Sequence, residues 1–394
     1  MSPNLNRPST ADGHAILADR IFDGHGWHSG KAVLMQGGRI AGLASPGEIS
    51  SDWPQMRLPA GVFLAAGFID LQVNGGAGVL LNDQPTAEGM RAIARAHRRY
   101  GTTACLPTLI TDTRTQMRTA IAAARSAAGR DGIIGLHLEG PFISPQRPGV
   151  HQPNRIVQPA AGDLEHLREL AGAGRSLITL APECVPAGFV HTLASSGVRI
   201  SIGHSEASAA IVMQAVAEGV TGVTHLFNAM PPLSARAPGI VGAALAEPRL
   251  TAGLIADGIH VDPISVRAAF AAKGSDRIAL VTDAMPTVGT SLDRFDLAGR
   301  TIRLADGRLT TDEGTLAGAH LDMASAVRNA VRLADVSLED ALRAASLTPA
   351  RFLGLEHERG AIVPGTRADL VALTDELTVV ATWVDGEIES YGVP

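Results

Sequence analysis

Four residues that could bind a metal ion, or work beside one, are spread along the chain, each near the end of a short apolar run typical of a β-strand. They are Glu139, His204, His225 and Asp283. Ligands on one helix would recur three or four positions apart, whereas these need a fold that brings separate strand ends together. A parallel α/β barrel does so at the carboxyl ends of its strands. One carboxylate, two imidazoles and an aspartate there could hold a divalent ion and activate water.

The order of the elements favours such a barrel. Apolar runs alternate with stretches of helical spacing. We expect strands at residues 62–70, 102–106, 133–139, 177–180, 198–203, 223–227, 251–255 and 278–283, and helices at 87–100, 114–128, 206–218 and 263–273. This pattern predicts a (β/α)8 TIM-like barrel. A doubly wound open sheet is the alternative, but Gly75-Gly76-Ala77-Gly78 lacks the G-x-G-x-x-G spacing of its nucleotide loop.

Both ends of the chain have a different texture, with short alternating segments separated by turns. The pattern in residues 1–61 and in residues 361–394 predicts antiparallel strands. Each end is too short to bury a core by itself. We therefore expect the two ends to pair into one small β-sandwich domain. Residues 62–360 would then form the barrel, inserted between the two halves of the small domain.

Composition limits the class of protein. The chain has 394 residues, of which 45% are hydrophobic and 18% charged, enough to bury a sizeable core. A net charge of −6 argues against nucleic-acid binding. Cys105 and Cys184 offer no disulfide framework. The first seven residues lack the apolar core of a signal peptide, and no run reaches membrane-spanning length, so we expect a cytoplasmic enzyme with no membrane partner.

Five segments carry a family resemblance. They are His137–Phe142, Gly203–Ser205, Thr224–Met230, Ala256–Asp262 and Val281–Ala284. In this order they closely resemble the N-acetylglucosamine-6-phosphate deacetylases of the amidohydrolase superfamily, and the likeness runs from about residue 59 to the C-terminus. Single histidines at strand ends are generic to the superfamily. The sequences His-Leu-Glu-Gly-Pro-Phe and His-Leu-Phe-Asn-Ala-Met are specific to the deacetylases.

The resemblance implies a division of roles in the hydrolysis of N-acetylglucosamine 6-phosphate to glucosamine 6-phosphate and acetate. Glu139, His204 and His225 would bind one divalent metal ion per subunit, zinc or ferrous iron. Asp283 would take a proton from the attacking water and hand it to the departing amine. His151 is the candidate for polarising the acetyl carbonyl. His137, two residues before Glu139, could act directly or could only pack.

Two features bear on the number of metal ions. The only lysines are Lys31 and Lys273, so the expected fourth strand at 177–180 has no lysine that could be carboxylated to bridge two metals. The first strand ends with Gln72 and Asn74, where many amidohydrolases carry a His-x-His ligand pair. Amides are weak metal ligands. We therefore expect one metal ion, with a second site near these amides absent or poor.

The sugar phosphate needs an anion site, and the resemblance assigns it to Arg236, helped by Asn228 and Ala229. The further substrate contacts that it implies are Val150, His151, Asp257, His260, Leu316, Ala317 and Gly318. Family members can lend such loop residues across a dimer interface, so a homodimer or higher homo-oligomer is expected.

The sequence leaves several alternatives open. No acidic residue follows Arg236 directly, and Met285 follows Asp283-Ala284; both departures from the family pattern could change the sugar specificity. A deacetylase of another amino sugar, such as N-acetylgalactosamine 6-phosphate, is the nearest alternative. A D-aminoacylase-like amidohydrolase without a phosphate site is more distant, and a non-catalytic barrel is more distant still.

Overall fold

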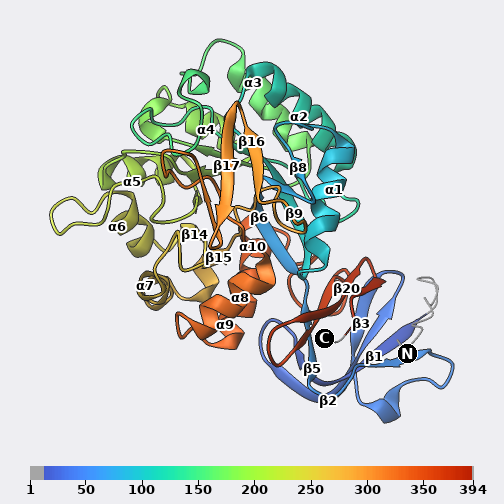
Figure 1. The fold of residues 1–394 in the computed structure, drawn as a ribbon. Helices are drawn as coiled ribbons and strands as arrows, with labels where there is room; N and C mark the ends of the chain where they lie inside the picture. Colours follow the sequence, from blue (N-terminus) through green and yellow to red (C-terminus); the bar gives the residue numbers. More distant parts are fainter. Residues whose placement is uncertain (1–12, 393–394) are drawn as a thin grey trace.

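The structure is a computed structural model that describes residues 13–392. Its larger part is a barrel of eight parallel strands (Figure 1). In chain order these strands are β6 (Phe68–Val73), β9 (Thr102–Ile110), β10 (His137–Glu139), β11 (Leu177–Leu180), β12 (Arg199–Ile202), β13 (Gly222–Val223), β14 (Thr251–Leu254) and β15 (Ile278–Leu280). A parallel bridge between Val73 and Ala284 joins the first strand to the end of the eighth. The predicted (β/α)8 barrel is confirmed.

Helices surround these strands. They are α1 (Ala87–Arg98), α2 (Arg114–Ala127), α3 (Asp163–Arg168), α4 (Phe189–Ala194), α5 (Ala209–Glu218), α6 (Gly239–Ala246), α7 (Pro263–Lys273), α8 (Met323–Arg332), α9 (Leu338–Ala345) and α10 (Leu347–Leu353), with short 3-10 turns η1 (Pro46–Glu48), η2 (Pro153–Arg155), η3 (Glu169–Gly172), η4 (Pro182–Cys184) and η5 (Ser275–Arg277). Side-chain caps mark several starts: Thr86, Thr113 and Asp262 accept backbone N–H groups at the first turns of α1, α2 and α7. Helix α5 begins at Ala209, later than predicted, because Ser208 caps it.

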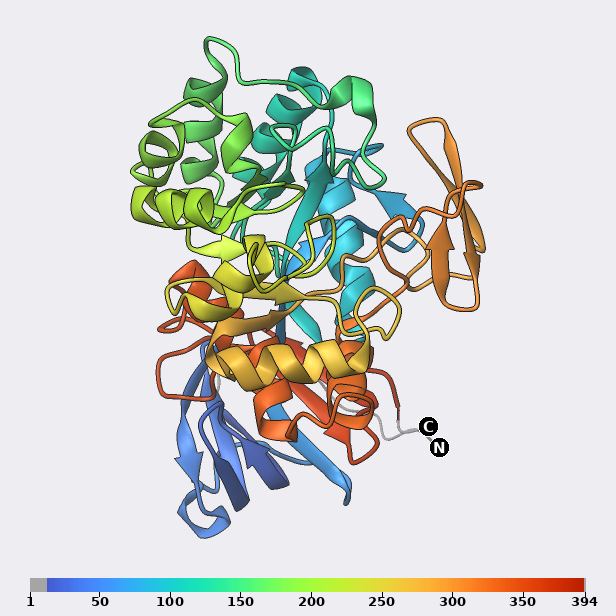
Figure 2. The same ribbon diagram turned by 90° about the vertical axis from the view of Figure 1, so that its left-hand side faces the viewer.

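Strands from both ends of the chain form the small β-domain, as predicted. They are β1 (His14–Phe22), β2 (Trp27–Gln36), β3 (Arg39–Ala44), β4 (Gln55–Arg57), β5 (Val62–Ala66), β19 (Leu370–Thr374), β20 (Val379–Val384) and β21 (Glu387–Ser390). All eight strands are hydrogen-bonded into one sheet, in which the two ends meet where β5 pairs antiparallel with β19. Figure 2 shows the blue strands of this sheet at the lower end of the molecule, below the barrel.

The strand expected at residues 62–70 is two strands, which is a correction. Residues 62–66 form β5 in the small sheet, and Phe68 opens β6 in the barrel. Gly67 stands between them, where a Cβ atom would lie 2.1 Å from Thr103 Oγ1, so only glycine permits this close approach. Residues 62–66 thus pair with the small domain, while the other predicted domain limits stay predictions.

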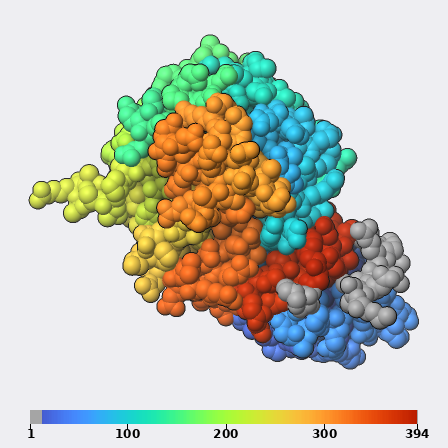
Figure 3. Space-filling model, in the orientation of Figure 1, coloured from blue at the N-terminus to red at the C-terminus, as the bar shows by residue number. Residues whose placement is uncertain are grey.

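The structure also contains strands that were not predicted. A hairpin of β7 (Gly75–Gly76) and β8 (Val79–Leu80) follows the first barrel strand, and a three-stranded sheet of β16 (Arg294–Leu297), β17 (Arg300–Ala305) and β18 (Arg308–Thr310) follows the eighth. Figure 3 shows this insertion, in orange, over the middle of one face of the barrel. Its Leu297, Ile302 and Leu309 share an apolar cluster with Val150 and Met285.

In the part of the chain that the structure describes, no helix is long and apolar enough to cross a membrane. The N-terminal seven residues, in which we expect no signal peptide, lie outside the described residues.

Candidate active site

The carboxyl ends of the barrel strands surround a pocket of about 370 Å³. Most of the residues predicted from the sequence line it: Glu139, Val150, His151, His204, His225, Asn228, Ala229, His260, Asp283, Leu316 and Gly318. This is the position at which barrel folds place their functional residues. The structure therefore brings together side chains that are separated by up to about half the length of the chain.

At the centre of the pocket, a carboxylate and two imidazoles converge. Glu139 is the last residue of β10, and His204 and His225 each lie two residues beyond the ends of β12 and β13. Glu139 Oε1 lies 3.1 Å from His204 Nε2 and 3.0 Å from His225 Nε2, and the two nitrogens are 3.0 Å apart. All three side chains are buried. The strand ends thus direct three potential ligand atoms at one point.

The chemistry of these atoms fits a divalent cation. His204 Nδ1 lies 2.8 Å from the carbonyl oxygen of Arg147. A carbonyl only accepts, so Nδ1 carries the ring proton and Nε2 presents a bare lone pair to its neighbours. Burial acts to raise the pKa of Glu139, but its interactions with the neighbouring imidazoles of His204 and His225 hold that pKa well below its usual value. An ionised carboxylate beside a bare imidazole nitrogen is a donor set suited to a divalent metal ion.

His151 borders this centre. Its ring centroid lies 4.4 Å from that of His204, and ligand atoms of Glu139, His151 and His204 lie within 4.8 Å of one another. Burial lowers the pKa of His151 to about 3, so the ring is neutral at pH 7. Its Nδ1 lies 2.6 Å from Thr111 Oγ1, and the Thr111 hydroxyl is placed to donate to the carbonyl oxygen of Glu139 at 3.1 Å. A hydroxyl has one proton, so the predicted role of His151 as a carbonyl donor requires Thr111 to donate to His151 Nδ1 instead of to Glu139, which leaves the ring proton on Nε2.

The amides of the first strand contact Asp283. Its Oδ1 accepts hydrogen bonds from Asn74 Nδ2 at 2.6 Å and from Gln72 Nε2 at 3.1 Å. Burial raises the pKa of Asp283 to about 6, and the negative charge of Glu139 adds to the shift. The residues that occupy the position of the expected His-x-His pair therefore act here as donors to a carboxylate.

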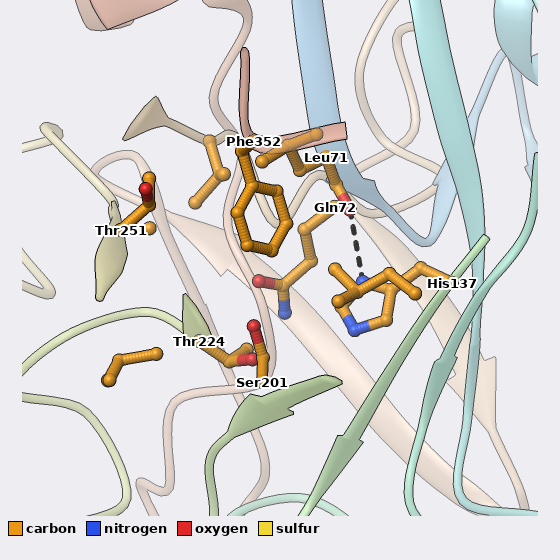
Figure 4. A pocket seen from close by; sticks show the side chains of 11 residues that line it. Leu71, Gln72, His137, Ser201, Thr224, Thr251 and Phe352 are labelled. Carbon is orange, nitrogen blue, oxygen red and sulfur yellow. Dashed lines mark hydrogen bonds between the residues drawn. The ribbon is translucent and has the colours of Figure 1, made fainter. Parts of the chain in front are cut away.

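A much smaller cavity of about 20 Å³ lies in the barrel interior, lined by Gln72 and His137 among others (Figure 4). It has room for about one water molecule and none for a sugar. His137 Nδ1 lies 3.0 Å from the carbonyl oxygen of Leu71, the contact dashed in Figure 4, and Nε2 lies 2.8 Å from Thr179 Oγ1. Burial lowers the pKa of His137 to about 4. Both ring nitrogens of His137 thus have hydrogen-bond partners inside the barrel, which fits the packing role rather than the direct role considered from the sequence.

Four residues that line the pocket have a strained backbone conformation. His204, His225, Ala229 and Asp283 all have positive φ angles, of 48°, 30°, 50° and 51°. Residues with side chains rarely adopt this region, and such residues cluster at functional sites where the surroundings hold them. Each lies in the segment that follows a barrel strand, where the strained backbone aims a side chain or peptide group into the pocket.

Three of the predicted residues do not line the pocket. Asp257 lies behind His260, whose Nδ1 is 2.6 Å from Asp257 Oδ2, so Asp257 orients that ring. Ala317 is fully buried, although its neighbours Leu316 and Gly318 line the pocket. Arg236 is exposed, in a loop (residues 231–238) whose residues 232–238 are all exposed and which protrudes from the body at the left of Figure 3. The structure does not bring Arg236 to the pocket of its own chain.

Sequence reasoning missed several pocket residues, including Gln146, Arg147, Ile255 and Thr315. Arg147 forms an ion pair with Glu206, two residues beyond His204. The available signal was position, because Gln146 and Arg147 stand in the same loop as Val150 and His151. From the sequence alone, Arg147 cannot be distinguished from an ordinary solvent-exposed loop arginine, because its place in the pocket depends on how the loop folds.

Comparisons with known proteins show the family of the chain. The model of the Amidohydrolase family matches residues 63–388. An N-acetylgalactosamine-6-phosphate deacetylase of Shewanella sp. (strain ANA-3) is 42% identical, over 98% of each chain. An N-acetylglucosamine-6-phosphate deacetylase of Haemophilus influenzae is 33% identical, over 90% of this chain and 94% of its own. The crystal structure of N-acetylglucosamine-6-phosphate deacetylase from Pasteurella multocida superposes with a TM-score of 0.92 at 33% identity, covering 96% of this chain and 100% of that one. The chain belongs to the amidohydrolase family and, within it, to the deacetylases of N-acetylated amino-sugar 6-phosphates.

Proposed function

We propose that this hydrolase removes the acetyl group of N-acetylglucosamine 6-phosphate, giving glucosamine 6-phosphate and acetate. The observation that carries the proposal is the buried convergence of Glu139, His204 and His225 beside Asp283. Relatives with matching segments over nearly the whole chain are named deacetylases of such sugars. We further propose that the enzyme is cytoplasmic.

One divalent ion, zinc or ferrous iron, would be held by Glu139, His204 and His225. When bound, such an ion makes water acidic enough to attack near neutral pH and polarises a carbonyl. Asp283 takes a proton from the attacking water and delivers it to the departing amine. Both amide hydrogen bonds to Asp283 end on Oδ1, so Oδ2 is the oxygen that exchanges the proton. His151, with its proton on Nε2, donates to the acetyl oxygen.

The sugar would lie among the apolar and backbone groups of Val150, Leu316 and Gly318, with Asn228, Ala229 and His260 on another side of the pocket. Ala317 would present only its backbone, because its side chain faces the apolar cluster. Asp257 would act by orienting His260. The amide pair Gln72 and Asn74 offers only weak ligands for a second metal, and the NH2 groups of both amides donate to Asp283.

The phosphate would be bound by Arg236 of a second copy of the chain. This proposal rests on the exposure of Arg236 and on the protruding loop that carries it away from its own pocket. Mixing Arg236→Ala subunits with Asp283→Asn subunits tests it. A mixed dimer then has one site with its own Asp283 and the other subunit's Arg236, so activity should return. If mixing restores nothing, Arg236 does not act across an interface.

A second substrate, N-acetylgalactosamine 6-phosphate, is favoured by one observation. The Shewanella relative, at 42% identity, is named for that sugar, which differs only in the configuration of one hydroxyl. An acetate-release assay with both epimers, each with and without the 6-phosphate, tests the function and the choice. We expect rapid release from a phosphorylated amino sugar. Equal rates with and without phosphate would refute the phosphate site, and no release from any of the four would refute the deacetylase function.

A further inference from the structure

A buried carboxylate that the proposed chemistry does not use lies beneath Asp283. Asp70, in the first barrel strand, is fully buried, and so is Thr282. Asp70 Oδ2 accepts a hydrogen bond from Thr282 Oγ1 at 2.5 Å, and Oδ1 accepts from the backbone N–H of Thr282 at 3.3 Å. A buried carboxylate needs such partners, because burial alone disfavours its charge. Asp70 therefore clamps the residue that directly precedes Asp283.

The clamp continues to the other side of Asp283. Thr282 Oγ1 accepts a hydrogen bond from the backbone N–H of Ala284 at 3.2 Å. The backbone N–H of Asp283 itself donates to the carbonyl oxygen of Gln72 at 2.9 Å. The three consecutive N–H groups of residues 282–284 are thus all held, two of them by the Asp70–Thr282 pair.

Asp283 lies in an irregular stretch between the end of strand β15 and the bridge at Ala284. Strand β15 ends at Leu280, three residues earlier. The backbone of Asp283 has a φ of +51°, a conformation that a residue with a side chain adopts only when its surroundings impose it. Alternate residues of one segment supply these surroundings: Asp70 holds Thr282, while Gln72 and Asn74 hold the Asp283 carboxylate.

We propose that Asp70, acting through the Thr282 hydroxyl, is a positioning residue that holds Asp283 where it exchanges a proton with water and the departing amine. This inference rests on the proposed function, in which Asp283 is the base. A shift of about 1 Å in a reacting group can lower a rate by about 100-fold. The clamp should therefore act on kcat rather than on substrate binding or on the metal.

Substitutions at Thr282 test the proposal. Thr282→Val keeps the shape and removes the hydroxyl, whereas Thr282→Ser keeps the hydroxyl. We expect Thr282→Val to lower kcat by about 10- to 100-fold, with KM and metal content unchanged, and Thr282→Ser to retain nearly the parental kcat. Thr366→Val is a matched control, because Thr366 is also buried and its hydroxyl donates to carbonyl oxygens of Ala361 and Val363. It should lower the melting temperature and leave kcat alone.

Parental kcat in Thr282→Val would overturn the proposal, and so would an equal loss of kcat in Thr282→Ser. If Thr282→Val fails to fold, the variant Asp70→Asn takes its place. The NH2 group of the asparagine cannot accept the hydrogen bonds that the Asp70 carboxylate accepts from Thr282. A parental kcat in Asp70→Asn would also overturn the proposal. Failure of the proposed function looks different, because then the parent enzyme itself releases no acetate.

Discussion

The two sides of the barrel mouth hold polar side chains in the same kind of position and use them differently. On one side, Glu139 ends strand β10, and His204 and His225 follow strands β12 and β13 by two residues. One side-chain atom of each lies within 3.1 Å of the other two. On the other side, the first strand offers the amides of Gln72 and Asn74, and these donate to Asp283. Carboxylate and imidazole suit a cation, whereas amide N–H groups suit an anion. A change of residue type at one strand end thus replaces a possible ligand pair with two hydrogen-bond donors to a carboxylate.

The largest effect should come from Glu139→Gln, which changes the side of the barrel mouth that suits a cation. The buried carboxylate loses its charge, so we expect the bound metal to be lost. Activity should fall by about 1000-fold or more, because a metal lowers the pKa of water from about 16 to about 7. Metal content by mass spectrometry, measured beside acetate release, checks this. A fully active variant with its metal retained would remove Glu139 from the centre.

Asp283→Asn should have the next largest effect. The amide keeps the shape of the side chain but cannot accept a proton, so kcat should fall by about 100- to 10,000-fold. The metal should remain, since Asp283 is held by amides and is not part of the ligand cluster. Steady-state kinetics with metal analysis checks both halves. Turnover close to that of the parent would show that another group moves the proton.

Asn74→Leu tests the anionic side. It removes the shorter of the two amide hydrogen bonds to Asp283 and leaves the side chain's size nearly unchanged. A hydrogen bond to a charged group contributes about 1.5–3 kcal/mol, so kcat should fall by roughly tenfold or somewhat more. The metal content should stay at the parental value. Loss of the metal in Asn74→Leu would mean that the amide is a ligand after all.

The smallest effect concerns pH. Asp283 must be ionised to act as a base, so kcat/KM should fall as the pH falls through its pKa. Burial places that pKa at about 6, and a bound cation favours the carboxylate and moves it down toward 3.8. The acid limb should therefore be centred no higher than about pH 6. In the parent enzyme, the hydrogen bond from Asn74 lowers the pKa of Asp283. Asn74→Leu removes this bond, so the pKa of Asp283 rises and the acid limb should move to higher pH. If the acid limb stays at the same pH in Asn74→Leu, the ionisation that it reports is not that of Asp283.

The convergence of the ligand cluster could be predicted because parallel strands end on the same face of a barrel. Glu139, His204 and His225 each follow an apolar run, and only the order of those runs was needed to place them together. The hydrogen bonds from Gln72 and Asn74 to Asp283 could not be predicted. They depend on how closely the first and eighth strands approach, which a bridge between Val73 and Ala284 sets.

Other elements escaped prediction for physical reasons. The strands on both sides of Gly67 are buried on both faces, so residues 62–73 form a nearly continuous apolar run. Such a run has no change in periodicity at Gly67 that would mark the break between the two strands. The sheet of β16, β17 and β18 has short strands with exposed arginines, which read as loops. Arg236 was assigned by resemblance alone, and in the structure it lies in an exposed loop outside the pocket of its own chain.

The most direct test is a titration of metal-free enzyme with zinc or ferrous iron, followed by both bound metal and acetate release. We expect activity to rise in proportion to bound metal and to level off at one ion per chain, with no binding in the Glu139→Gln variant. Activity that needs two ions per chain, or full activity in the thoroughly chelated enzyme, would contradict a single centre built from Glu139, His204 and His225.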